Sequence, residues 1–167
     1  FNKFTSHGIG YFFYIGGNDS MDTVSKLSLY AKKINSDIRF IGVPKTIDND
    51  LAHTDHTPGF GSAAKYVASM VREVAIDASV YDNKKSVTIV EIMGRHAGWL
   101  TAASALARKY DGDNPRLIYL PETAFDQEAF LKKVQEMLET TPNLVVCISE
   151  GIHDKNGTFV CELAGDI

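Results

Sequence analysis

The sequence is poor in cysteine, has no excess of basic residues and contains no long hydrophobic run. Two cysteines in 167 residues, Cys147 and Cys161, are too few for a disulfide scaffold, and we expect both to be reduced. The net charge of −4 argues against a nucleic-acid partner. No apolar run approaches the roughly 20 residues of a membrane-spanning helix, and no secretory signal is visible. We therefore expect a cytoplasmic protein with no membrane partner.

Short apolar runs alternate instead with segments of helical periodicity. The pattern predicts strands at residues 11–15, 38–43, 86–92, 117–120 and 144–149, and helices at 21–34, 63–78, 99–110 and 126–140. Asp126 is expected to be an N-cap. The run YFFYI at residues 11–15 is continuously apolar, which predicts a strand covered on both faces. This order indicates an α/β fold with parallel Rossmann-like sheets and helices on both faces.

Polar motifs follow four of the predicted strands. In parallel α/β sheets, ligands bind outside the carboxyl ends of the strands. The motifs there are GGNDS (16–20), PKTIDND (44–50), MGRHAG (93–98) and PE (121–122). The second motif opens a long polar loop at residues 44–62, and loops of that length are often functional. Four such motifs together predict a ligand site at this edge.

The chemistry of the first two motifs suits phosphate. Glycines before a helix let the backbone approach an anion, which the free amides of the helix then bind. Asp19 repels phosphate and would narrow the space for a long polyphosphate chain. Asp48 and Asp50 could divide proton transfer and orientation between them, and Lys45 could balance phosphate charge. The alternatives are an ordinary capped turn and a solvated acidic loop.

The last two motifs suit a sugar phosphate. Arg95 presents a planar fork of donors that matches phosphate oxygens, and Gly94 allows a sharp exit from the strand. Glu122 could accept hydrogen bonds from sugar hydroxyls. The alternatives are a surface arginine paired with a carboxylate and a loop glutamate without a ligand.

Together, the motifs GGNDS, PKTIDND, TPGFGSAAKYV, IVEIMGRHAGWLT, LPE and VVCISEG resemble the phosphofructokinase family over nearly the whole chain. The resemblance implies transfer of a phosphoryl group to the 1-hydroxyl of fructose 6-phosphate, giving fructose 1,6-bisphosphate in glycolysis, with Mg²⁺ as the metal. It makes Asp48 the base, with Thr46 and Asp50 beside it at the reaction centre. Arg95 reaches the transferred group, and Gly17 belongs to the donor loop. The implied fructose 6-phosphate contacts are Thr46, Asp48, Met93, Gly94, Arg95 and Glu122.

Two positions bear on the phosphoryl donor. Family members that use ATP usually have glycine where this sequence has Asp19 and Lys45, whereas pyrophosphate-using members usually have aspartate and lysine. The resemblance therefore favours pyrophosphate. An ATP-dependent 6-phosphofructokinase and a non-catalytic module that binds sugar phosphate are the alternatives.

The sequence also departs from the family pattern. Asn18 stands where the family usually has a magnesium-binding aspartate, and a neutral amide is the weaker ligand. We expect residues 1–58 to belong to a donor domain and 59–167 to a fructose 6-phosphate domain, both as parts of a longer, homo-oligomeric parent. The fragment alone is expected to be inactive. The whole hypothesis requires Asp48 and Arg95 to converge on one cleft.

Overall fold

The computed structural model describes residues 1–81 and 83–163, and the chain divides into two compact units. The first unit is Phe1–Thr46, and the second begins at Ile47. Each unit contains its own parallel sheet. The loop at residues 47–58, which was expected in the donor domain, belongs to the second compact unit.

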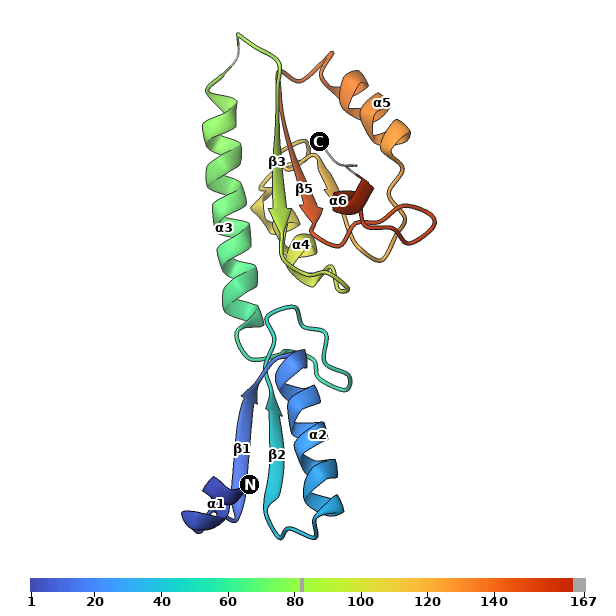
Figure 1. The fold of residues 1–167 in the computed structure, drawn as a ribbon. Helices are drawn as coiled ribbons and strands as arrows, with labels where there is room; N and C mark the ends of the chain where they lie inside the picture. The colour runs from blue at the N-terminus through green and yellow to red at the C-terminus, as the bar shows by residue number, and fades with distance from the viewer. Residues whose placement is uncertain (82, 164–167) are drawn as a thin grey trace. The chain divides into compact units, whose positions relative to one another are not determined.

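The first unit is a β-α-β arrangement with one additional short helix. β1 and β2 pair in parallel, in register from Tyr11↔Arg39 to Gly16↔Pro44. α2 connects the two strands and packs against both (Figure 1). The short helix α1 was not predicted; its Phe4 packs against Phe12 and Phe40. The elements are α1 (Asn2–Ser6), β1 (Tyr11–Gly16), α2 (Asn18–Lys33) and β2 (Arg39–Pro44).

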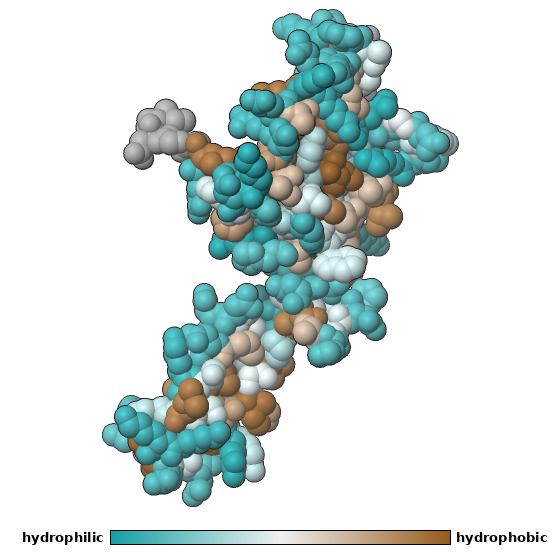
Figure 2. Space-filling view, turned by 90° about the vertical axis from the view of Figure 1, so that its right-hand side faces the viewer, coloured by the Kyte–Doolittle hydropathy of each residue, from teal (hydrophilic) through white to brown (hydrophobic). Residues whose placement is uncertain are grey.

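One face of β1 is exposed, so the prediction of a strand covered on both faces is wrong for the described chain. Tyr11, Phe13 and Ile15 are 69%, 61% and 68% exposed. Alternate residues of a strand point to opposite faces, and α2 covers only the other face. A continuous apolar run predicts a strand, but it does not establish that a covering element is present. Figure 2 shows apolar surface on both units.

The second unit is a three-stranded parallel sheet in the order β3-β5-β4. The last strand in the sequence, β5, therefore lies in the middle, paired with β3 from Ser86↔Asn143 and with β4 from Leu117↔Val146. The elements are α3 (Phe60–Ser79), β3 (Ser86–Ile92), α4 (Trp99–Ala103), the 3₁₀ helix η1 (Ser104–Ala107), β4 (Leu117–Tyr119), α5 (Gln127–Met137), β5 (Asn143–Ser149) and α6 (Val160–Leu163).

Helices cover both faces of this second sheet (Figure 1). On one face, Val71 of α3 packs in a cluster with Leu100 and Cys147. On the other face, Phe130 and Val134 of α5 pack against buried residues of β4 and β5. The prediction of a parallel sheet between helices is confirmed here. Val145, Val146 and Cys147 are 0% exposed, so β5 is the core of the unit.

Most predicted elements are present, with differences at their ends. The Asp126 N-cap is confirmed, since its carboxylate accepts from Ala129 N at 2.9 Å. The helix predicted at residues 99–110 is shorter: α4 passes into η1 at Ser104, and the helical path ends before Arg108, whose backbone is extended (φ −71°, ψ 134°). The short helix α6 was not predicted. In the described part of the chain, no helix has both the length and the apolar character needed to cross a membrane.

Candidate active site

The motifs that follow β1 and β2 lie side by side at one edge of the first sheet. Lys45 N donates to Gly16 O at 2.9 Å, which extends the strand pairing beyond Gly16↔Pro44. Asp19 is exposed in the first turn of α2, and Lys45 is exposed at the end of β2. The structure thus places Gly17, Asp19 and Lys45 at the carboxyl ends of neighbouring strands.

The turn from β1 into α2 can accept an anion. Gly17 is the N-cap of α2, with extended backbone (φ −83°, ψ −159°), so the chain passes directly from strand into helix. The first-turn amides of α2 have no partners within the helix, and its dipole favours negative charge there. Asn18 is exposed in the same turn. The Lys45 ammonium and the Asp19 carboxylate add one positive and one negative side chain to this edge.

Asp48 and Asp50 lie at the start of the second unit, in the loop that leads to α3. Asp48 is half-buried and Asp50 is exposed. Between them, Asn49 is buried, and its side chain hydrogen-bonds the loop at Asp55 and Thr57. Thr46, the last residue of the first unit, is half-buried. The two carboxylates therefore belong to a loop with internal hydrogen bonds.

The turn after β3 depends on a glycine. Gly94 has φ +127°, and a Cβ at this position would lie 2.4 Å from Ala97 O. Its amide donates to Glu150 Oε1 at 3.1 Å, and its carbonyl accepts from Ser149 Oγ at 2.6 Å. Ser149 Oγ also accepts from Gly151 N at 3.0 Å. The end of β5 thus holds the turn that presents Met93 and Arg95, both of which are exposed.

Glu122 holds the far end of the same segment. Its Oε1 accepts from Gly98 N at 2.7 Å, where α4 begins. The segment from Gly94 to Gly98 is therefore bonded to one carboxylate after β4 and another after β5. The packing is close as well, since a Cβ on Gly151 would lie 1.8 Å from Arg95 O. We call this segment together with Met93, residues 93–98, the arginine loop.

Three residues that shape these loops, Glu150, Ser149 and Asn49, were not predicted from the sequence. Glu150 directly follows a buried strand, and that signal was available in the motif VVCISEG. Ser149, at the end of β5, bonds the turn after β3, and the order of the strands in the sequence does not reveal that β3 and β5 pair. Asn49 is uncharged and lies between two carboxylates, so the motif drew attention to Asp48 and Asp50 instead. The convergence of Asp48 and Arg95, which belong to the same unit, stays a prediction.

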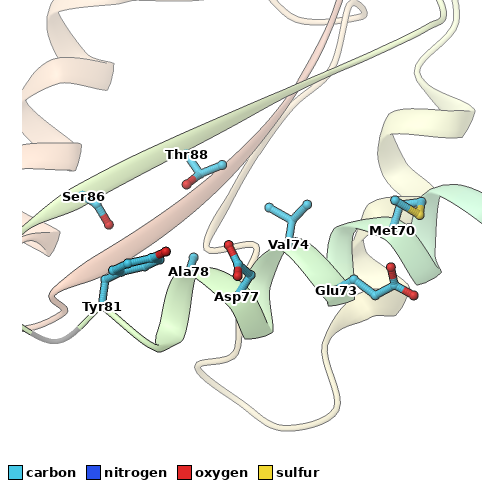
Figure 3. A pocket seen from close by; sticks show the side chains of 8 residues that line it. All are labelled: Met70, Glu73, Val74, Asp77, Ala78, Tyr81, Ser86 and Thr88. Atoms are coloured by element: carbon cyan, nitrogen blue, oxygen red, sulfur yellow. The ribbon is translucent and has the colours of Figure 1, made fainter.

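A separate hollow lies between α3 and β3, with a volume of about 500 Å³ (Figure 3). Ser86 begins β3 and lines this hollow, so the hollow is at the end of the strand opposite to the arginine loop. The carboxylates of Glu73 and Asp77 disfavour phosphate there. The lining residues are Met70, Glu73, Val74, Asp77, Ala78, Tyr81, Ser86 and Thr88. None of them is a predicted site residue.

Comparison with known proteins decides the family. The family model described as Phosphofructokinase matches residues 1–166. This chain belongs to the phosphofructokinase family. A relative from Xanthomonas campestris pv. campestris (strain B100), named pyrophosphate–fructose 6-phosphate 1-phosphotransferase, is 55% identical over 161 residues, which are 96% of this chain and 38% of the relative. A relative from Amycolatopsis methanolica, named ATP-dependent 6-phosphofructokinase, is 35% identical over 148 residues, which are 87% of this chain and 31% of the relative.

Solved phosphofructokinase structures share the fold. The crystal structure of a pyrophosphate-dependent phosphofructokinase from Marinobacter aquaeolei matches with a TM-score of 0.79 and 45% identity. The match covers 92% of this chain and 40% of that protein. This chain therefore spans about two fifths of the length of the Xanthomonas and Marinobacter phosphofructokinases. The α/β fold with parallel sheets is that of the family.

Proposed function

We propose that the protein containing this chain is a pyrophosphate–fructose 6-phosphate 1-phosphotransferase of glycolysis. The observation that supports this most is the placement of Asp19 and Lys45 at the ends of the adjacent strands β1 and β2. A second support is that the relative with 55% identity is named for this activity, whereas the relative named for ATP is 35% identical. The reaction converts pyrophosphate and fructose 6-phosphate into orthophosphate and fructose 1,6-bisphosphate.

The donor end fits a diphosphate better than a nucleoside triphosphate. Gly17 and the first-turn amides of α2 bind one phosphate, and Lys45 neutralises charge on the other. The Asp19 carboxylate occupies and repels the space that a third phosphate would need. Phosphoryl transfer depends mainly on position and charge, so these few groups are enough to set donor preference.

The acceptor end supplies the base. The Asp48 carboxylate takes the proton of the 1-hydroxyl as that oxygen bonds to phosphorus, and the bond to the leaving orthophosphate breaks. Thr46 and Asp50 stand beside it. Arg95 neutralises the charge of the transferred group.

The sugar phosphate lies against the arginine loop. Met93, Gly94 and Arg95 contact it, together with Thr46 and Asp48. Glu122 accepts from a sugar hydroxyl while it also accepts from Gly98 N, because one carboxylate can take several hydrogen bonds. Residues 1–58 then supply the donor site together with Thr46 and Asp48 of the sugar site, and residues 59–167 supply the other contacts of fructose 6-phosphate.

The residues present are compatible with Mg²⁺ held mainly by substrate. Within residues 1–81 and 83–163, no group of three or more His, Cys, Asp or Glu side chains is placed to hold a metal ion. Mg²⁺ does not require such a group, because it keeps several waters and binds one or two protein ligands plus phosphate oxygens. The Asn18 amide oxygen is the candidate protein ligand. The metal would neutralise charge on the diphosphate.

The remaining parts of the proposal concern the protein's surroundings. We place the enzyme in the cytoplasm as a homo-oligomer, with fructose 6-phosphate and pyrophosphate as its partners. We assign it no nucleic-acid or membrane partner.

The deciding experiment compares donors on a full-length protein that contains this chain. Fructose 1,6-bisphosphate formation is measured with pyrophosphate and with ATP at equal Mg²⁺, and pyrophosphate should be preferred by at least about 100-fold in kcat/KM. The double variant Asp19→Gly, Lys45→Gly should lose most of that preference. A matched control, Asp22→Gly, changes an exposed acid one turn further along α2 and should keep it.

The other outcomes identify the alternatives. Preference for ATP in the unchanged protein would reject the donor assignment and favour the activity named for the Amycolatopsis relative. Binding of fructose 6-phosphate without turnover of either donor would favour a non-catalytic module.

A further inference from the structure

Asn49 has a backbone conformation that most residues avoid. It lies between Asp48 and Asp50 with φ +58°, in the left-handed region. Non-glycine residues are uncommon there, and asparagine is among the few that tolerate it. Asn49 is also only 9% exposed, whereas Asp50 beside it is exposed. A buried polar side chain at such a position needs hydrogen-bond partners.

The Asn49 side chain bonds the loop through both of its polar atoms. Nδ2 donates to Asp55 O at 3.1 Å, and Oδ1 accepts from Thr57 N at 2.9 Å. Thr57 is itself 3% exposed, so its amide has little access to water. Removing the Asn49 side chain would leave the buried Thr57 amide without its hydrogen-bond acceptor, which is unfavourable.

These bonds connect the carboxylates to a rigid element. Phe60 N, at the start of α3, donates to Thr57 O at 3.1 Å. Phe60 packs against the core cluster that contains Val71 and Cys147. A continuous path therefore leads from the residue between Asp48 and Asp50, through Thr57, into the core of the second unit.

Glycine, aspartate and alanine each fail at least one of the three requirements of this position. Glycine tolerates the positive φ but has no side chain to bond the loop. Aspartate can accept from Thr57 N, but it cannot donate to Asp55 O and it adds a third negative charge beside Asp48 and Asp50. Alanine lacks the bonds and is strained at this φ. Asparagine combines the conformation, the donor and the acceptor.

We propose that Asn49 is a positioning residue, which fixes the Asp48 carboxylate in the geometry needed for phosphoryl transfer. This rests on the proposed function, because it takes Asp48 to be the base. Asn49 acts through the backbone on either side of it and through the loop bonds, without touching substrate. A base displaced by about 1 Å can lose on the order of 100-fold in rate, so the effect of Asn49 should fall on kcat.

The test compares Asn49→Gly with His53→Gly in the full-length protein. His53 lies in the same loop, has φ +57° and is exposed, so its replacement makes the same backbone change without removing a buried side chain. Asn49→Gly should lower kcat about 100-fold per folded molecule and change the KM for fructose 6-phosphate less than about threefold. His53→Gly should stay within about twofold of wild type for both.

Hydrogen exchange at the Thr57 amide separates this inference from the proposed function. Asn49→Gly should speed exchange there at least about tenfold. Asn49→Asp keeps the acceptor and should leave exchange within about threefold of wild type. If the unchanged protein turns over neither donor, the proposed function fails, and the exchange rates still decide whether Asn49 restrains the loop. An unchanged kcat per folded molecule, or unchanged Thr57 exchange, in Asn49→Gly overturns the inference.

Discussion

The loop that contains Asp48 and the arginine loop are held in place by opposite means. The first is bonded by a residue within itself, since Asn49 contacts Asp55 and Thr57. The arginine loop is bonded from outside, by Glu122 after β4 and by Ser149 and Glu150 at the end of β5. The first arrangement restrains the residue between Asp48 and Asp50, and the second holds a whole segment against the sheet. We therefore expect substitutions in the first loop to affect turnover and those around the second to affect stability first.

The largest effect should come from Asp48→Ser in the full-length protein. Loss of a general base typically costs 10²- to 10⁴-fold in rate, so kcat should fall by about that factor, with a smaller change in the KM for fructose 6-phosphate. The control is Asp55→Ser, which removes an exposed carboxylate from the same loop and should keep kcat within about twofold. Nearly normal turnover in Asp48→Ser would show that Asp48 is not the base. It would also contradict the expectation that this loop controls turnover.

Gly94→Ala should be the most destabilising single change in the arginine loop. Its φ of +127° is strained for any residue with a Cβ, and that atom would meet Ala97 O. We expect a loss of about 2–4 kcal/mol in the free energy of unfolding, measured by urea denaturation. Gly61→Ala, where a Cβ meets nothing within 4 Å, should change it by less than about 1 kcal/mol. Equal effects of the two would show that the turn does not require glycine.

Ser149→Ala sharpens the contrast between the two loops. It leaves Gly94 O and the buried Gly151 N without the serine hydroxyl, which should cost about 1–3 kcal/mol. Ser79→Ala, which removes an exposed hydroxyl bonded to Ile76 O, should cost less than about 0.5 kcal/mol. Turnover per folded molecule should fall less in Ser149→Ala than in Asn49→Gly, and the reverse order would contradict the comparison.

The smallest expected effect is on the chemical modification of a cysteine in β5, the strand that supports the arginine loop. Cys147 on β5 is buried, and burial raises the pKa of its thiol above the usual value. Cys161 is exposed. At pH 8, iodoacetamide should modify Cys161 and leave Cys147 unmodified until denaturant is added, as read by mass spectrometry. Rapid modification of Cys147 in the folded protein would mean that β5 opens locally and cannot support the loop as described.

The contrast between local bonds and bonds from distant elements also explains which features the sequence could predict. The ends of β3 and the Asp126 cap follow from local pattern, and both are confirmed. The bonds around Gly94 could not be predicted, because β5 comes after β4 in the chain and yet pairs with β3. The helix after Gly98 was predicted too long, because apolar periodicity gives no sign of the change to extended backbone at Arg108.

The functional residues show the same limit. Motif chemistry made Asp19, Lys45, Asp48 and Arg95 candidates, since charged groups after strands are visible in the sequence, and their roles stay predictions. The restraints on those residues were not visible, because a serine or an asparagine has no distinctive signal. Even a local contact such as that of Asn49 depends on a backbone angle that the sequence does not show.

The open side of β1 has a practical consequence for work on the 167-residue chain by itself. The exposed row of Tyr11, Phe13 and Ile15 on one face of a two-stranded sheet lowers solubility and favours association of chains through that face. Samples should bind the dye ANS and scatter more light as they are concentrated. Replacing Phe13 with threonine keeps a strand-forming residue and lowers the hydrophobicity of that side, which makes it the first change to try for preparative work.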